Sequence, residues 1–502
     1  MYNKKIPYLI ITLAAFIAVY LLWEVYPYAV ARPDTPRYFF QAQDFQWLTL
    51  QWRDTLHGPL YSFVTAASLL FTEPAIALYW YNASLFILSM LCTYFVLTKI
   101  FSSRVLGLLT TLSLLLIEIF SMRVFIYSIF AYSDAMYAHF TYCGVLLIIL
   151  GYLQNRNTPK YIGFSLFGLA AFTRQIGLSF VLVWGFILLF QLVRTYRKTR
   201  NRKACLTLII CISLLAVPAS AWSLRTVILS HGESRGSLGF HLLWRFHEIW
   251  QNKGIERPRN IEQAKNWENI ELHIDNDEPS AIITKLVADK PEIIRHQYIK
   301  PVSDNYNFYV AVQSLRYLFT DYLYVVARDY GYAFSPNRIY KTEYFGYYDY
   351  NENQYSAIPP RELNPYVLSL MYPHGTPTKE VSHTYLESLF YTICCQNIIM
   401  NSVHSIGYIG AIFIHLIVLF TLLLQWLLRK SQDYNWAIPY LFTINILLIT
   451  AFTHTLITVA VTSFKVRFAL PGSMMIHLSL ILFTVLIMKI LRKAYSIQRN
   501  RL

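Results

Sequence analysis

The chain has 502 residues, of which 55% are hydrophobic, 17% are aromatic and only 14% are charged. This composition excludes an ordinary soluble protein and indicates one that crosses a membrane several times. The excess of 43 Lys and Arg over 28 Asp and Glu does not require a nucleic-acid partner, because basic residues collect in the cytoplasmic loops of membrane proteins.

Apolar segments long enough to cross a bilayer recur along the chain. A hydrocarbon core about 30 Å thick needs roughly 20 apolar residues in a helix. The clearest segments are residues 8–27, 75–98, 104–120, 135–153, 204–228, 402–428, 436–456 and 468–491. A further stretch, 161–193, is too long for one crossing and is interrupted by "TRQIG", so we divide it into two. The sequence predicts an all-α polytopic membrane protein with about ten transmembrane helices.

Basic residues predict the orientation of these helices, because short cytoplasmic loops are rich in Lys and Arg. If the N-terminus is cytoplasmic, every turn on its side is basic. These segments carry Lys4 and Lys5, Lys99 and Arg104, Arg156 and Lys160, residues 194–203, Arg429 and Lys430, and residues 491–502. We therefore expect both termini in the cytoplasm. We take the plasma (inner) membrane of a bacterium as the location, with an endoplasmic reticulum membrane as the alternative. The first apolar run is longer than that of a signal peptide, so we interpret it as a retained signal anchor.

Charge and turn-forming residues become frequent after residue 228, which predicts a domain outside the membrane. The expected organisation is an N-terminal transmembrane bundle at 1–228, an extracytoplasmic domain at 229–400 and C-terminal transmembrane helices at 401–502. We expect the middle domain to be mainly helical. Its predicted helices lie around 240–252, 258–270, 279–298 and 304–328.

The first outer loop, 28–58, contains an acid held close to the membrane. Asp34 lies in "RPDTPRY", where two prolines stiffen the chain and prevent a simple helical continuation. Such a carboxylate can act as a general base or bind a divalent cation. The alternative is that it pairs with Arg32 or Arg37 as a solvated loop charge.

Two further charges interrupt apolar segments on the same side of the membrane. Asp134, in "AYSDAMYAHF", begins the fourth predicted crossing, where Ser133 and Asp134 could simply cap the helix. It faces the same compartment as Asp34, so the two acids could share one site. Arg174, in "LAAFTRQIGLSF", could stabilise the turn between two crossings or present its planar guanidinium to a phosphate.

The stretch "VTSFKVRFALPGSMMIH" places Lys465 and Arg467 in a short outer connection, against the usual distribution of basic residues. They could anchor the loop or bind an anionic lipid head group. The six cysteines and thirteen histidines show neither a disulfide framework nor a zinc-binding spacing.

Taken in chain order, these stretches resemble the GT-C class of integral-membrane glycosyltransferases, which includes protein mannosyltransferases and aminoarabinose transferases. The resemblance runs through nearly the whole membrane portion. It rests on "PDTPRY" followed by "HGPLYSFVTAASLLF", and on "YSDAMYAHF", "AAFTRQIGL", "VPASAWSLRTVILSHGESRGSLGFHLLW" and "FKVRFALPG". The chain departs from the family pattern at Gln175, Thr226 and Phe468, where Pro, Asn and Tyr are usual.

The resemblance implies transfer of a sugar from a polyprenyl-phosphate donor to a hydroxyl of a lipid, glycan or protein acceptor. Asp34 would be the base or would orient the acceptor, and Asp134 would assist it or help hold a divalent cation. The residues implied to bind the lipid phosphate are Arg174, Arg225, Lys465 and Arg467. Tyr38, His57 and Tyr61 would line the sugar and acceptor pocket, although a structural His and interfacial Tyr anchors are alternatives. The competing interpretation is a cell-envelope polysaccharide polymerase, ligase or flippase without this chemistry.

Overall fold

A computed structural model describes the main elements of the chain. The described residues are 5–25, 29, 31, 35–43, 58–121, 125, 130–229, 239, 242, 245–246, 249–250, 308, 311–312, 314–333, 347–349, 354–356, 365–375, 378–380, 406–428, 432–461 and 470–499.

Each of the ten predicted crossings falls on one helix. These are α1 (Ile6–Val25), α4 (Pro74–Phe101), α5 (Arg104–Ser121), α6 (Ser133–Leu153), α7 (Asn157–Thr173), α8 (Leu178–Thr199), α9 (Arg202–Leu229), α18 (Ile406–Leu428), α19 (Ile438–Val461) and α20 (Leu470–Arg499). Among the described residues, eight helices are long and apolar enough to cross a membrane. The two shorter helices are α5, with 18 residues, and α7, with 17. The chain is an all-α polytopic membrane protein, as predicted.

Shorter elements join and cover the long helices. They are α2 (Thr35–Gln43), α3 (Leu60–Ser68), α14 (Phe319–Ala333), α15 (Pro365–Met371), the 3-10 helices η2 (Gln175–Gly177) and η6 (Gln432–Ala437), and the strands β1 (Tyr347–Asp349), β2 (Gln354–Ser356) and β3 (Thr378–Glu380). The strands form an antiparallel sheet in the order β1-β2-β3. This sheet was not predicted, because strands of three residues are too short to show an alternating pattern.

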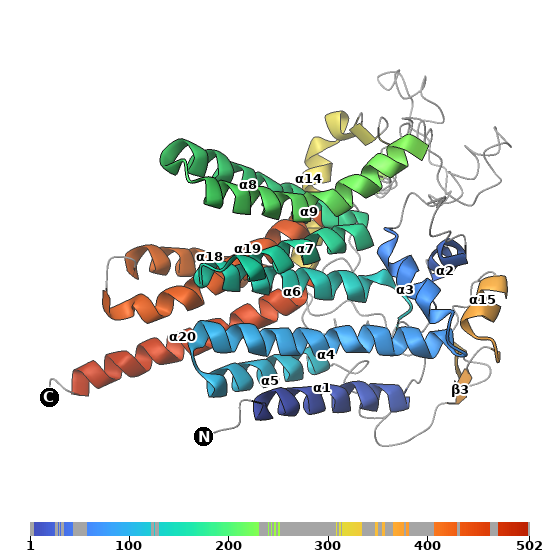
Figure 1. Ribbon diagram of the computed structural model, residues 1–502, viewed down its shortest axis with the longest axis horizontal. Helices are drawn as coiled ribbons and strands as arrows, with labels where there is room; N and C mark the ends of the chain where they lie inside the picture. Colours follow the sequence, from blue (N-terminus) through green and yellow to red (C-terminus); the bar gives the residue numbers. More distant parts are fainter. Residues whose placement is uncertain are drawn as a thin grey trace.

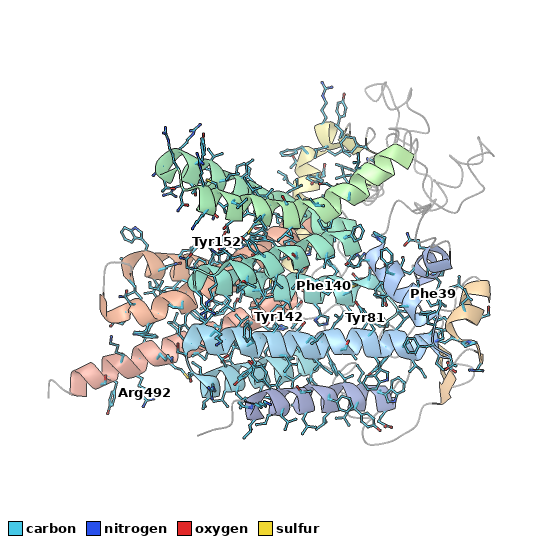
Figure 2. All side chains as sticks on the ribbon, viewed as in Figure 1. Phe39, Tyr81, Phe140, Tyr142, Tyr152 and Arg492 are labelled. Carbon is cyan, nitrogen blue, oxygen red and sulfur yellow. The ribbon has the colours of Figure 1, made fainter. Side chains whose placement is uncertain are left out.

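Figure 1 shows that the two termini lie at the same end of the bundle, while α2, α3 and α15 lie at the opposite end. The turns α4–α5, α6–α7 and α8–α9, which carry predicted cytoplasmic charges, also lie at the terminal end. In Figure 2, Arg492 of α20 is at the terminal end and Phe39 of α2 is at the other. The basic turns are therefore separated from the segments that follow the first span.

Helices α6 and α7 approach closely because glycines face each other where they pack. A Cβ added at Gly163 would lie 2.7 Å from the backbone oxygen of Gly144, and one at Gly144 would lie 3.0 Å from the oxygen of Gly163. Inside a membrane, where apolar burial gives little preference for one helix neighbour, such small residues allow tight van der Waals packing. This packing positions the start of α6 beside the end of α7.

The long apolar stretch 161–193 is divided where "TRQIG" predicted. Helix α7 ends at Thr173, and Arg174 has an extended backbone with φ −143° and ψ 135°. The chain then forms the single turn η2 before α8 begins. The break leaves Arg174 outside both helices, at the end of the bundle opposite the termini.

The middle region of the chain contacts the N-terminal bundle as well as the C-terminal helices. Helix α14 packs against α18 and α19, whereas α15 packs against α2 and α4. The Tyr372 hydroxyl, just after α15, donates a 2.7 Å hydrogen bond to the oxygen of Ala29, and the amide of Ala29 donates to the oxygen of Ala75 at 3.0 Å. His374 lies 3.3 Å from the carboxylate of Glu73. Of the helices predicted in 229–400, those around 258–270 and 279–298 lie outside the described residues.

Replacing Gly163 by Ala should lower the free energy of unfolding by about 1 to 3 kcal/mol, the usual cost of overpacking a tight contact. The neighbouring backbone of α6 would have to move to accept the new methyl group. Unfolding of the full-length protein by SDS in mixed micelles measures the change. Gly185→Ala is the matched control, because a Cβ there meets nothing within 4 Å. Equal stabilities of the two variants would contradict the close α6–α7 contact.

Candidate functional site

Three stretches that the sequence singled out meet at the end of the bundle opposite the termini (Figure 1). They are the short helices α2 and α3 after the first span, the start of α6, and the break between α7 and α8. Each stretch follows or interrupts an apolar segment, so its polar groups are held near the end of a long helix. The site is built from residues far apart in the sequence.

An ion pair between Asp134 and Arg174 lies at the centre of this site. Nη1 of Arg174 donates to Oδ1 of Asp134. The Asp134 side chain is 1% exposed and that of Arg174 is 12% exposed, so the pair reaches the surface through the guanidinium. Asp134 is in the first turn of α6, where the helix dipole favours a carboxylate. The N-cap position of α6 is occupied by Tyr132, so neither Ser133 nor Asp134 is the N-cap residue that the sequence offered.

Arg174 follows the end of α7, and the backbone at Gly58, just before α3, packs against this end of the helix. A Cβ at Gly58 would lie 2.1 Å from the oxygen of Phe172, so only a glycine allows the chain to lie against the end of α7. The guanidinium also lies over the ring of Tyr132, 5.5 Å from its centroid, which favours a cation at this position. The "HGPLY" and "TRQIG" stretches are therefore in contact.

Tyrosine side chains connect α2 and α3 to the start of α6. The hydroxyls of Tyr38 and Ser133 share a hydrogen bond of 2.7 Å. The ring of Tyr38 meets Tyr61 edge-on at 5.0 Å and Tyr132 at 6.0 Å. Tyr38 and Tyr61 are fully buried, and Tyr38 contacts Tyr132, whose ring lies under the Arg174 guanidinium.

Two polar side chains hold the segment that leads into α6. Asn82 of α4 donates to the oxygen of Phe130 at 2.8 Å and to the hydroxyl of Tyr61 at 3.5 Å. Thr35, the first residue of α2, donates to the oxygen of Ala131 at 2.9 Å. Burial raises the pKa of Tyr61 above its ordinary range, so this phenol stays protonated and serves as a hydrogen-bonding group rather than a base.

Asn82 and Tyr132 were not identified from the sequence. Asn82 is a single amide in the apolar run of α4, and a polar group placed there must find a hydrogen-bond partner. That isolation is a signal that could have found it. Tyr132 is one of 39 tyrosines, and nothing in its local sequence distinguishes it.

Four of the predicted site residues are described with their side chains, and the structure brings all four together. They are Tyr38, Tyr61, Asp134 and Arg174. The other predicted residues fall elsewhere: Asp34, His57, Lys465 and Arg467 lie outside the described residues, and Arg225 is described only by its backbone in α9. Their placement at this site stays a prediction.

The ion pair determines which chemistry Asp134 and Arg174 can contribute. A guanidinium carries five donors in a planar fork, which suits the oxygens of a phosphate. Asp134 faces a cation already, so it is better placed to orient Arg174 than to ligate a metal. Within the described part of the chain, no group of three or more His, Cys, Asp or Glu residues could hold a metal ion.

A second ionisable pair inside the bundle was also missed by the sequence analysis. Nδ1 of His477 in α20 lies 2.7 Å from Oε1 of Glu118 in α5, and Glu118 is fully buried. Charged groups within transmembrane helices are costly and are usually paired. Glu118 is the single acid of an apolar helix, which is the feature that could have identified it.

No family model and no curated protein matches the chain. Among solved structures, the chain is similar to ArnT from Cupriavidus metallidurans, whose crystal structure was determined bound to undecaprenyl phosphate. The identity is 11%, the match covers 95% of this chain and 78% of that chain, and the TM-score is 0.34. A likeness at this level defines neither fold nor activity here, so both are taken from this chain's own residues.

Replacing Asp134 by Asn should destabilise the protein by about 3 to 5 kcal/mol, because it leaves a largely buried guanidinium without its counter-charge. SDS-induced unfolding of the full-length protein measures the loss. The double variant Asp134→Asn with Arg174→Gln should recover part of it. Glu73→Gln is the control, since its pair with His374 is exposed and should contribute under about 1 kcal/mol. If Asp134→Asn is as stable as Glu73→Gln, the Asp134–Arg174 pair does not stabilise the fold.

Proposed function

We propose that the protein is a GT-C-type membrane glycosyltransferase that moves a sugar from a polyprenyl-phosphate donor to an acceptor hydroxyl on the outer face of the membrane. The observation that carries the proposal is the Asp134–Arg174 ion pair, around which three of the five GT-C-like stretches meet. A resemblance between scattered short motifs gains weight when the motifs are in contact in space.

The reaction needs a base for the acceptor hydroxyl and cations that stabilise the departing phosphate. As the acceptor oxygen bonds to the anomeric carbon, the bond from that carbon to the phosphate oxygen breaks. The acceptor hydroxyl loses its proton to a base, and we assign that role to Asp34. Negative charge grows on the departing lipid phosphate, so a guanidinium fixed at that position favours the transition state. Arg174 is the described candidate, with Arg225, Lys465 and Arg467 as further cations.

The remaining predicted residues have supporting roles in this proposal. Asp134 orients Arg174 through the ion pair. Tyr38 and Tyr61 are fully buried, so we assign them to the layer that supports the sugar and acceptor pocket, where the hydrogen bonds to Ser133 and Asn82 fix their rings. His57 would line the same pocket.

The proposed orientation places the termini and the basic turns in the cytoplasm and the site outside, in a bacterial inner membrane. Residues 1–228 would form the bundle that carries the catalytic first outer loop, 229–400 the extracytoplasmic domain and 401–502 the C-terminal helices. The shared end of both termini and the basic turns (Figure 1) supports this arrangement.

Cysteine labelling tests the orientation. In a variant lacking the six native cysteines, His374→Cys should react with a membrane-impermeant maleimide in intact cells, because this side chain is 75% exposed on the proposed outer side. Asn201→Cys, in the exposed α8–α9 turn, should react only after the membrane is permeabilised. The reverse pattern would place the site in the cytoplasm.

The transferase activity is tested with the full-length protein in liposomes that contain labelled polyprenyl-phosphate sugars, supplied one at a time. Asp34→Asn should lower turnover at least about 100-fold, as expected for loss of a general base. Arg174→Lys should lower it roughly 10- to 100-fold, because Lys keeps the charge but loses the planar fork. Neither should reduce membrane expression.

Glu73→Gln is the control for this assay, because Glu73 lies on the same side of the protein in an exposed pair and should leave turnover unchanged. Full turnover by Asp34→Asn would remove Asp34 from the catalytic role. If the wild-type protein transfers no sugar from any donor of the panel, the glycosyltransferase proposal fails.

A further inference from the structure

Helix α14 is fixed beside two membrane helices by polar contacts. The Tyr322 hydroxyl donates a 2.8 Å hydrogen bond to the oxygen of Ala460, next to the last residue of α19. Two turns further along α14, the Tyr330 hydroxyl and Nε2 of His415 in α18 share a hydrogen bond of 2.9 Å. Helix α14 therefore contacts α19 at its last turn through Tyr322 and α18 nearer its middle through Tyr330.

A small apolar cluster packs against α14 next to these contacts. Its buried members are Phe246, Ile249, Trp250, Ala311 and Val325. The ring of Phe246 stacks on Tyr322 at 5.5 Å, which ties the cluster to the helix that contacts α19. This cluster is separate from the main core of the bundle.

One arginine is enclosed beside this apolar cluster. The side chain of Arg245 is 0% exposed, and its Nη1 donates to Oδ2 of Asp329 in α14. Arg328 holds the other carboxylate oxygen: its Nε and Nη2 lie 3.0 Å and 2.8 Å from Oδ1. One carboxylate thus receives hydrogen bonds from two guanidinium groups.

Arg245 keeps a second edge that the Asp329 contact does not use. Within the described part of the chain, its Nε and Nη2 are buried and have no hydrogen-bond partner. Burying a donor without a partner costs about 1 to 3 kcal/mol, and more when the group is charged. A buried charged group is normally completed by an acceptor.

The two unused donors form a fork. Nε–H and Nη2–H lie on one edge of the planar guanidinium and point in the same direction, which matches two oxygens of an oxyanion. Arg328 uses the same pair of atoms to hold one oxygen of Asp329, so one such edge in the cluster is occupied by a carboxylate. Arg245 presents the other.

We propose that Arg245 binds a phosphoryl group through Nε and Nη2, at a site separate from the Asp134–Arg174 pair. The phosphoryl group comes from a lipid head group or from free phosphate. The contact of Tyr322 with the end of α19 puts the cluster near the depth at which lipid head groups lie. The site stands on α14 and Arg245 rather than on α6 and α7, so it does not depend on the transferase activity.

Thermal unfolding of the full-length protein in lipid nanodiscs tests the site. Phosphatidic acid added to phosphatidylcholine nanodiscs should raise the Tm of the wild-type protein by several degrees. Arg245→Lys keeps the charge beside Asp329 but lacks the fork, so it should weaken the apparent affinity at least about 10-fold. Arg316→Lys is the matched control, because Arg316 is exposed just before α14, and it should keep the full shift.

A second set of nanodiscs without phosphatidic acid is titrated with inorganic phosphate. A shift with phosphatidic acid alone identifies a lipid head group, whereas a shift with both identifies the phosphoryl group itself, and either result supports the site. No shift of the wild-type protein with either ligand overturns it. If Arg245→Lys and Arg316→Lys reduce the Tm shift equally, the site is also overturned, since equal reductions indicate non-specific attraction between the ligand and basic residues.

If Arg245→Lys does not fold, native mass spectrometry of the wild-type protein decides. One copy of phosphatidic acid should remain bound after activation that removes phosphatidylcholine. Equal retention of the two lipids would overturn the site.

Discussion

An ionised group cannot be left uncompensated between transmembrane helices, and the pairing of Asp134 with Arg174 is the clearest case in this protein. The pair fixes the first turn of α6 against the break between α7 and α8, and the closely packed glycines Gly144 and Gly163 allow those helices to meet. Tyr38 of α2 then packs against Tyr132 and Ser133 at the start of α6, and Tyr61 of α3 packs against Tyr38. The need to pair Asp134 with Arg174 therefore links the helix break, the packing of α6 on α7 and the geometry of the site.

The membrane helices could be predicted from the sequence because a bilayer demands a long apolar run for each crossing. Asp134 and Arg174 were identifiable for the same reason, as charges that interrupt or adjoin such runs, while the role of Asp34 stays a prediction. The contact between Asp134 and Arg174 was not, since it joins residues 40 positions apart and depends on how α6 and α7 pack. Tyr132 and the Arg245–Asp329 pair were missed because their partners are defined only by the tertiary structure, whereas Asn82 could have been found as the single amide of an apolar run.

Arg174 and Arg245 are each paired with an aspartate but lie in different surroundings. Arg174 is partly exposed and faces a carboxylate at the end of a helix, where a ligand can approach it from water. Arg245 is enclosed beside an apolar cluster, and a group bound there would be shielded from competing solvent. An accessible cation suits a substrate that must come and go, whereas an enclosed one suits a group that is retained.

The hydrogen bond from the Tyr372 hydroxyl to the oxygen of Ala29 connects the end of α15 to the segment that follows α1. Ala29 is held by Ala75 on one side and by Tyr372 on the other, only a few residues before Asp34. Any movement of α15 would pull on the chain between α1 and α2. A molecule that docks against α15 would in this way shift the start of α2 without touching it.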